Sequence, residues 1–155
     1  LVVQGGMMRT IADFVVYSPD DQVQLIVEVK NRKGTTDEWA AAMRRNLLAH
    51  AMIPPSRFFL LALPEYFYLW TPDQSVEAIP ANYKVVSRGI LKRFWDDAKL
   101  EDLSEQSLEI LVSSWLNELI SSRLAKESSP ELSWIFDSGL YESIKDGSIR
   151  AETAA

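Results

Sequence analysis

Runs of apolar residues predict that the chain begins with a β-hairpin. Residues 10–17 and 23–29 are rich in Val, Ile, Phe and Tyr, the residue types that favour strands. The polar run SPDDQ at residues 18–22 separates them and has the composition of a tight turn. We therefore expect two antiparallel strands joined by a short loop.

A helix is predicted after this hairpin. Residues 36–51 favour a helix that ends ahead of Pro54, and Thr35 followed three residues later by Glu38 fits a capping box at its start. The apolar face of this helix is expected to lie across the sheet and comprises Trp39, Met43 and Leu47.

A second hairpin and a mixed segment come next. Residues 58–63 and 66–70 are almost continuously apolar, which predicts two strands, the first of them covered on both faces. Aromatic side chains of the second strand are expected in the core, with stacking on exposed bases as the alternative. Residues 83–99 combine basic and aromatic side chains and predict a loop with a short helix, suited equally to a surface helix or a nucleic-acid contact.

The last third of the chain is predicted to be helical. Apolar residues recur at helical spacing over residues 104–126, with Ser104 as N-cap, and shorter helices are expected over residues 130–138 and 140–146. The apolar stripe of the long helix is broad enough to pack on a neighbouring helix or to form a homodimer. It comprises Leu108, Leu111, Val112, Trp115, Leu116, Leu119, Ile120 and Leu124.

Together these elements predict the α/β class, with a mixed central sheet flanked by helices and a helical C-terminal extension. Residues 1–99 are expected to form the core. Residues 100–150 are expected to pack on that core or on a partner subunit, and residues 151–155 to be a frayed tail.

Composition narrows the possible chemistry. The 155 residues are 47% hydrophobic and 25% charged, which is typical of one globular domain. With no cysteine and one histidine, disulfides, thiolate metal sites and multi-histidine zinc sites are excluded, so a metal would need oxygen ligands. The absence of cysteine fits a cytoplasmic location, and no apolar run is long enough to predict a membrane span.

Charge is distributed unevenly. The net charge of −6 argues against an indiscriminate nucleic-acid coat. Residues 1–57 carry seven basic and six acidic side chains, whereas residues 101–155 carry four basic and eleven acidic ones. A phosphate backbone would therefore meet the N-terminal portion or residues 84–99.

The candidate chemistry lies at one end of the first hairpin. If Ser18 and Val23 close the loop, Asp13 lies opposite Glu28, and Lys30 projects to the same face. Facing carboxylates repel each other unless a positive charge lies between them. That charge is either the Lys30 ammonium, in a simple surface ion pair, or a divalent cation such as Mg²⁺, which favours carboxylate oxygens.

This pattern resembles the signature of the PD-(D/E)XK nuclease superfamily. The signature has an Asp at the start of one strand, a polar turn, then Glu/Asp-x-Lys on the next strand, followed by a helix. Here it is carried by Ala12-Asp13 and Glu28-Val29-Lys30, with Ala12 where the signature has Pro, and it covers about residues 9–70. The resemblance implies a restriction-endonuclease-like fold and a metal-dependent nuclease acting on DNA, with Mg²⁺ or Mn²⁺ as cofactor.

By the same resemblance, Asp13, Glu28 and the backbone carbonyl of Val29 would hold the cation. Lys30 would orient the attacking water or stabilise charge on the phosphorane, so Asp13, Glu28 and Lys30 are the candidate catalytic residues. Nucleic-acid contacts are expected from Arg32, Lys33, Arg44, Arg45, Lys92 and Arg93.

Two other functions remain open from the sequence. One is a catalytically inactive module that binds partners through its C-terminal helices. The other is a binder of RNA or single strands through residues 84–95.

Overall fold

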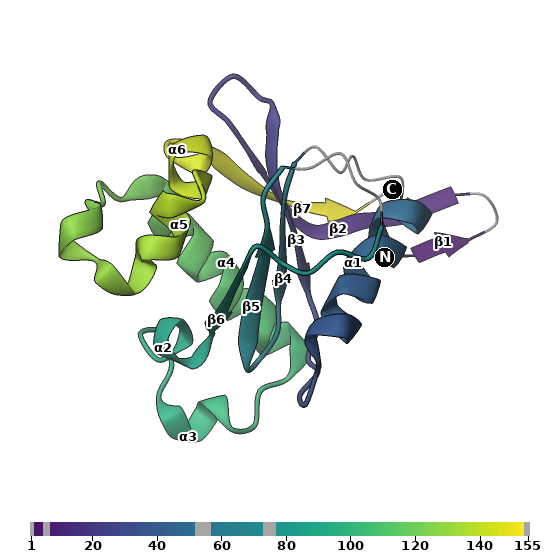
Figure 1. Ribbon diagram of the computed structural model, residues 1–155, viewed down its shortest axis with the longest axis horizontal. Helices are drawn as coiled ribbons and strands as arrows, with labels where there is room; N and C mark the ends of the chain where they lie inside the picture. Colours follow the sequence, from purple (N-terminus) through teal and green to yellow (C-terminus); the bar gives the residue numbers. More distant parts are fainter. Residues whose placement is uncertain (1, 5–6, 52–56, 73–76, 154–155) are drawn as a thin grey trace.

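The computed structural model describes residues 2–4, 7–51, 57–72 and 77–153, and a single β-sheet lies at its centre (Figure 1). Seven strands within these residues form the sheet. They are β1 (Val2–Gln4), β2 (Met7–Tyr17), β3 (Val23–Val29), β4 (Phe58–Ala62), β5 (Tyr66–Trp70), β6 (Tyr83–Val86) and β7 (Ser148–Thr153).

The sheet is mixed. Strands β1 to β6 lie side by side in chain order, and β7 pairs with β2 outside this path. Strands β3 and β4 are parallel, whereas all other pairs are antiparallel. The predicted α/β class with a mixed central sheet is therefore confirmed, and so is the second hairpin, formed by β4 and β5.

Helices cover this sheet, and within the described residues none is both long enough and apolar enough to cross a membrane. They are α1 (Asp37–Ala51), α2 (Arg88–Leu91), α3 (Asp97–Leu100), α4 (Glu105–Ser121), α5 (Ser133–Asp137) and α6 (Leu140–Ile144), with 3₁₀ turns at Lys126–Ser128 and Pro130–Leu132.

The first hairpin has the predicted register from Phe14, which pairs with Val27, to Val16, which pairs with Leu25. The predicted closure by Ser18 and Val23 is wrong, because the register shifts after Val16 and Tyr17 pairs with Val23. Asp13 and Glu28 directly adjoin the pair of Phe14 and Val27.

Helix α1 makes the crossover between the parallel strands β3 and β4. The predicted capping box of Thr35 and Glu38 is wrong by one residue. Thr36 caps the helix instead, because its Oγ1 accepts the Trp39 N–H at 3.0 Å and its carbonyl accepts the Ala40 N–H.

Of the apolar face predicted for α1, Leu47 is buried against the sheet, whereas Trp39 and Met43 are only partly buried. The charged Arg44 is buried on this helix as well.

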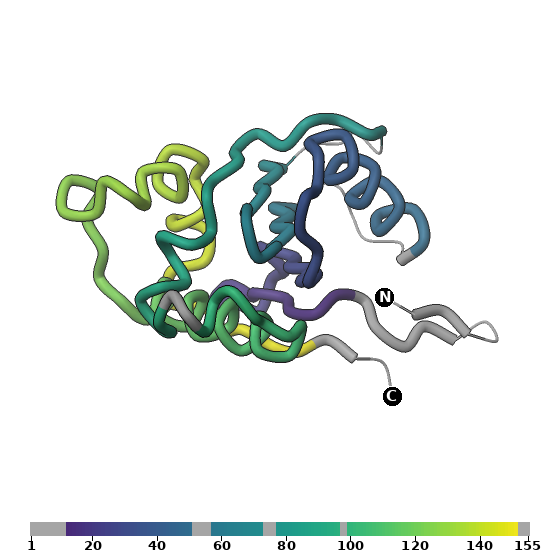
Figure 2. Tube along the Cα trace, turned by 90° about the horizontal axis from the view of Figure 1, so that it is seen from below, coloured from purple at the N-terminus to yellow at the C-terminus, as the bar shows by residue number. Residues whose placement is uncertain are grey.

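Apolar residues fill both faces of the sheet, which gives three layers (Figure 2). Along β3, Leu25, Val27 and Val29 belong to one cluster and Ile26 to the other, as strand alternation requires. Helix α1 covers the face of Ile26. Helices α2, α4, α5 and α6 cover the opposite face.

Helix α4 belongs to the helical layer opposite α1, and its apolar stripe faces the sheet of the same chain. Trp115 is 1% exposed, and its ring centroid lies 5.2 Å from that of Phe67 on β5. The stripe predicted to form a homodimer is therefore not exposed to a second subunit. The helix starts at Ser104, as predicted, but ends at Ser121 rather than at residue 126, because the backbone of Ser122 is already extended.

Two segments differ from the sequence-based expectation. The predicted loop at residues 83–99 begins with strand β6. The predicted tail is wrong for residues 151–153, which belong to β7 and pair with β2. Local propensity gives no sign of this strand, since its pairing partner lies at the other end of the chain.

Gly147 allows β7 to approach β2. A Cβ atom at this position would lie 2.1 Å from the carbonyl oxygen of Tyr17 and 2.9 Å from that of Ile144. We predict that Gly147→Ala lowers the free energy of unfolding by about 2 kcal/mol, since backbone must move to relieve the overlap. Urea denaturation measures the change.

The matched control is Gly89→Ala, because a Cβ there meets no atom within 4 Å. This variant should be as stable as the parent or slightly more stable. Equal stability of the two variants would contradict the close docking of β7 on β2.

Candidate metal and catalytic site

The hairpin brings together the three residues that the sequence predicts. Asp13 lies near the middle of β2, Glu28 lies next to the end of β3, and Lys30 directly follows β3. The Asp13 Oδ2 atom accepts the backbone N–H of Val29, the residue between Glu28 and Lys30 in the sequence, at 2.7 Å. The metal contact predicted for the Val29 carbonyl oxygen stays a prediction.

Glu28 is a deeply buried carboxyl group. The residue is 1% exposed, and its Oε2 atom has no hydrogen-bond partner among the described residues. Burial raises the pKa of Glu28 from 4.5 to about 7, and the charge of Asp13 and a hydrogen bond with it add to the rise. Ionising this group is therefore costly unless a further positive charge is present.

Lys30 supplies only part of that charge. Its Nζ lies 3.6 Å from Glu28 Oε1, too far for a hydrogen bond, and its side chain is 33% exposed. Lys30 lowers the pKa of Glu28, but burial and Asp13 outweigh it. A simple ion pair therefore does not account for the buried carboxylate, and the ammonium remains within reach of a bound molecule.

Glu109 of α4 is a third carboxyl group, which the sequence-based prediction missed. Burial raises the pKa of Glu109, and the charges of Asp13 and Glu105 and a hydrogen bond with Asp13 raise it further. The charge of Lys30 lowers the pKa of Glu109. Both Glu28 and Glu109 thus adjoin Asp13.

Hydrogen bonds join the start of α4 to the segment directly after β3, and they explain why Glu109 lies near Asp13. The Asn31 backbone N–H donates to Glu105 Oε1 at 3.0 Å, and the Asn31 side-chain amide donates to the Leu103 carbonyl at 2.9 Å. Glu109 lies one helical turn after Glu105 and therefore on the same side of α4. No local motif signals this contact, because it depends on how the two halves of the chain pack.

The donor atoms fit a hydrated magnesium-type cation. Within the described residues, no three His, Cys, Asp or Glu side chains are grouped so as to hold one metal ion. Mg²⁺ does not require such a cage, since it keeps several waters and binds one or two carboxylates together with substrate phosphate. Asp13 and Glu28, whose Oε2 atom has no partner among the described residues, are the two carboxyl groups that could serve in this way.

The basic residues predicted to contact nucleic acid are found in different environments. Arg32 and Lys33 are exposed in the turn after Lys30. The Arg32 guanidinium lies 5.4 Å from the centre of the Trp39 ring, and Lys33 donates to the Glu101 carbonyl at 3.1 Å. These two side chains are placed next to the site.

Arg44 and Arg45 of α1 differ in their exposure to solvent. Arg45 is exposed, as a nucleic-acid contact requires. Arg44 is 1% exposed and lies 5.7 Å from the centre of the Trp70 ring, so a phosphate backbone cannot reach it in this structure. The prediction for Arg44 is wrong because that position of α1 faces the sheet.

Lys92 and Arg93 are exposed beyond the end of α2. Arg93 forms an ion pair with Glu118 of α4, and both basic residues border a hollow of about 380 Å³ that also contacts Trp134. They belong to the layer of α2 and α4, and their predicted role in binding nucleic acid stays a prediction.

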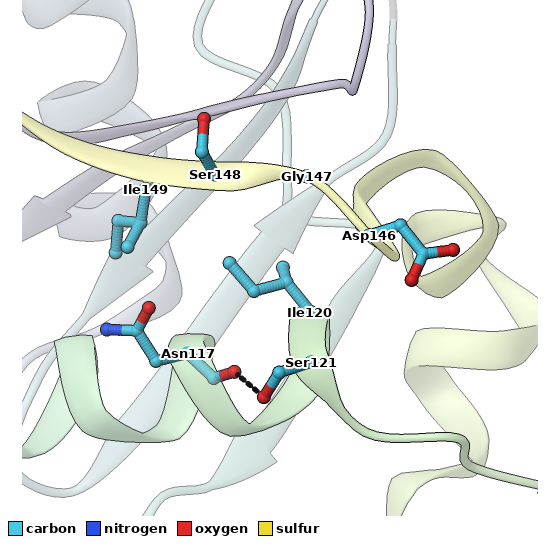
Figure 3. A pocket seen from close by; sticks show the side chains of 7 residues that line it. All are labelled: Asn117, Ile120, Ser121, Asp146, Gly147, Ser148 and Ile149. Atoms are coloured by element: carbon cyan, nitrogen blue, oxygen red, sulfur yellow. Dashed lines mark hydrogen bonds between the residues drawn. The ribbon is translucent and has the colours of Figure 1, made fainter.

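A larger hollow of about 500 Å³ lies between the end of α4 and the start of β7 (Figure 3). The one carboxylate in its lining is Asp146, whose Oδ2 atom lies 3.7 Å from the Nη1 atom of Arg123. Its other polar groups include Asn117 and Ser121, whose hydroxyl donates to the Asn117 carbonyl. The lining contains none of the carboxylates around Asp13.

Comparisons with protein-family models, with curated proteins and with solved structures give no match. Any function must therefore be argued from the geometry of the chain itself.

The raised pKa of Glu28 predicts a specific pH dependence of stability. Between pH 4.5 and about 7 the folded protein holds a proton on Glu28 that the unfolded chain has lost, so stability falls as pH rises. Glu28→Gln removes this fall. Urea denaturation in EDTA should show the variant gaining about 3 kcal/mol on the parent between pH 4.5 and pH 8.

Glu131→Gln, a change at an exposed carboxylate, is the control and should follow the parent. A constant difference between parent and Glu28→Gln at the two pH values would show that Glu28 is not a desolvated acid.

Proposed function

We propose that this chain is a metal-dependent nuclease that hydrolyses phosphodiester bonds in DNA. The observation that carries the proposal is the buried Glu28 carboxyl group beside Asp13. Its Oε2 atom has no hydrogen-bond partner among the described residues, and Lys30 neutralises it only in part. Such a group is costly in a purely structural role. A bound cation would offset that cost.

Asp13 and Glu28 would hold the cation, assisted by the Val29 carbonyl. A bound Mg²⁺ or Mn²⁺ supplies polarisation of the phosphate and a lowered pKa of the attacking water. The hydrogen bond from Val29 to Asp13 fixes the direction of the carboxylate before any ligand arrives. Such preorganisation avoids the cost of rearranging the site during the reaction.

Lys30 would act on the phosphate. Its partly exposed ammonium, beside Glu28 and near Asp13, would stabilise negative charge that develops on the phosphorane or would orient the attacking water. The Lys30 Nζ lies 3.6 Å from Glu28 Oε1, which is too far for a hydrogen bond. The three ammonium protons of Lys30 are therefore not used by Glu28 and could be donated to a phosphate.

The fold supports the same proposal. The order of a β-hairpin, a helix and a strand parallel to β3 is the order that the resemblance to the PD-(D/E)XK superfamily implies, and it supports the proposal. We propose a restriction-endonuclease-like arrangement on this basis. Arg32 and Lys33 would contact the DNA backbone next to the scissile phosphate, because they directly follow Lys30 and are exposed.

The alternative of an inactive module that binds partners through its C-terminal helices has less support. It requires an exposed apolar face on α4, whereas the stripe around Trp115 is buried against the sheet.

The direct test is cleavage of plasmid, linear duplex and single-stranded DNA with Mg²⁺ or Mn²⁺. We predict cleavage that EDTA stops and that Lys30→Ala slows by about a hundredfold or more, as expected when a transition-state charge loses its partner. The control Lys145→Ala changes a lysine at the C-terminal end of α6 that pairs with Glu142, and this variant should cut like the parent.

Cleavage by Lys30→Ala at the parental rate would contradict the assigned role. Absence of cleavage by the parent on all three substrates with either metal would contradict the proposed function.

A further inference from the structure

Strand β6 forms one edge of the sheet (Figure 1). It is the last strand in the order β1 to β6, and among the described strands only β5 pairs with it. A strand at an edge presents a row of backbone N–H and C=O groups that have no partner strand. The register of β6 on β5 identifies these groups.

The Ser87 N–H donates to the Glu65 carbonyl at 3.0 Å, which sets the alternation along β6. Residues that bond to the neighbouring strand recur at every second position of an antiparallel pair. Val85 therefore directs its backbone groups toward β5, whereas Lys84 and Val86 direct theirs outward. Within the described residues, no hydrogen bond reaches these outward groups.

An apolar hollow of about 380 Å³ adjoins this edge. Its lining includes Val85 and Val86 of β6, Ile90 of α2 and Trp134 of α5. The Val86 side chain is 63% exposed, so the apolar surface of the hollow continues onto the strand itself. Successive side chains of a strand point to opposite faces of its sheet. Every second side chain of a segment paired with β6 would therefore project to the face on which the hollow opens.

The rim of the hollow carries a positive charge that the described part of the chain does not neutralise. Arg93 on this rim is paired with Glu118. Lys92 is exposed and forms no ion pair with a described residue, not even with Glu131, the one acidic residue of the lining. A carboxylate on a bound segment would complement this charge.

We propose that the free edge of β6 binds an extended acidic peptide of a partner protein, which adds a strand to the sheet. The peptide backbone exchanges hydrogen bonds with Lys84 and Val86, one apolar side chain fills the hollow, and a carboxylate pairs with Lys92. Backbone pairing supplies affinity in this mode of recognition, and the pocket supplies specificity. The inference goes beyond the proposed nuclease activity and does not depend on it.

Charge favours an acidic peptide over a second copy of this chain. A second β6 would bring its own Lys84, followed by Arg88 and Lys92, toward the same basic residues. A lysine on an edge strand also opposes pairing between identical edges. A nucleic acid could contact Lys92 and Arg93, but it has no peptide backbone with which to satisfy the outward groups of β6.

The test measures the binding of fluorescein-labelled peptides by fluorescence anisotropy. In these probes Val and Thr alternate between flanking Asp and Glu residues, and the central residue is Val, Leu, Phe or Trp. Matched probes carry Lys in place of every Asp and Glu. We expect at least one acidic peptide to bind about tenfold or more tightly than its basic counterpart, because only the acidic one pairs with Lys92.

Two variants locate the bound peptide. Val86→Pro removes an outward N–H that makes no hydrogen bond in the free chain, a position where edge strands accept proline, and should weaken binding by about tenfold. Lys92→Glu should weaken it by about fivefold. The matched control Lys145→Glu makes the same charge reversal at the end of α6, outside the lining of the hollow, and should bind like the parent.

Hydrogen exchange of the parent gives a readout that does not depend on how a variant folds. The amide protons of Lys84 and Val86 should exchange rapidly in the free chain and slowly when the acidic peptide is bound. The amide proton of Val85, which faces β5, should be protected in both states. Binding through side chains alone would leave Lys84 and Val86 unprotected and would contradict the added strand.

Two further measurements test the other occupants. A single-stranded thymidine oligonucleotide competes with the peptides in the anisotropy assay, and analytical ultracentrifugation follows the chain alone. The proposal is overturned if no acidic peptide binds more tightly than its basic counterpart, or if the oligonucleotide binds more tightly and displaces the peptides. Self-association that protects the amides of Lys84 and Val86 would assign the edge to a second copy and would also overturn it.

Discussion

The burial of the Glu28 carboxylate is the constraint on which the account of this protein depends. An acid that is 1% exposed, with one oxygen unpartnered and a second acid beside it, opposes folding when it is ionised. The surrounding structure tolerates it because sheet and helices bury a large apolar core on both faces. The cost is concentrated at one point, where Lys30 offsets only part of it, as is typical of residues held in place for chemistry.

The position of the site follows from the way the sheet is covered. Strands β2 and β3 bring Asp13 and Glu28 together by antiparallel pairing, while the crossover through α1 starts a parallel strand beside β3. Helix α4 then closes the other face, and its hydrogen bonds to Asn31 bring Glu109 to Asp13. The carboxyl groups near Asp13 thus come from both halves of the chain, and the C-terminal helices are part of the same structural unit.

Sequence patterns predicted the parts that depend on neighbouring residues. The existence of the first hairpin and its register from Phe14 to Val16 follow from strand propensity and turn chemistry, although the register shifts at Tyr17. The stripe of α4 follows from helical periodicity. Contacts between distant segments were not predictable in this way. Strand β7 forms because β2 offers a pairing partner, Arg44 is buried because of how α1 lies on the sheet, and Glu109 reaches the site through the docking of α4. Each of these depends on tertiary packing, which overrides local preference.

The most direct test of the central claim is anomalous scattering from crystals soaked in Mn²⁺. The account predicts a peak bonded to an oxygen of Asp13 and to Oε2 of Glu28, at the roughly 2.0–2.3 Å expected for hard cations of this kind. The Lys30 ammonium should lie near the bound manganese ion and should not occupy the position of the ion. A site free of manganese at saturating concentration, with the Lys30 ammonium hydrogen-bonded to Glu28 in its place, would contradict the account and reduce the cluster to a buried ion pair.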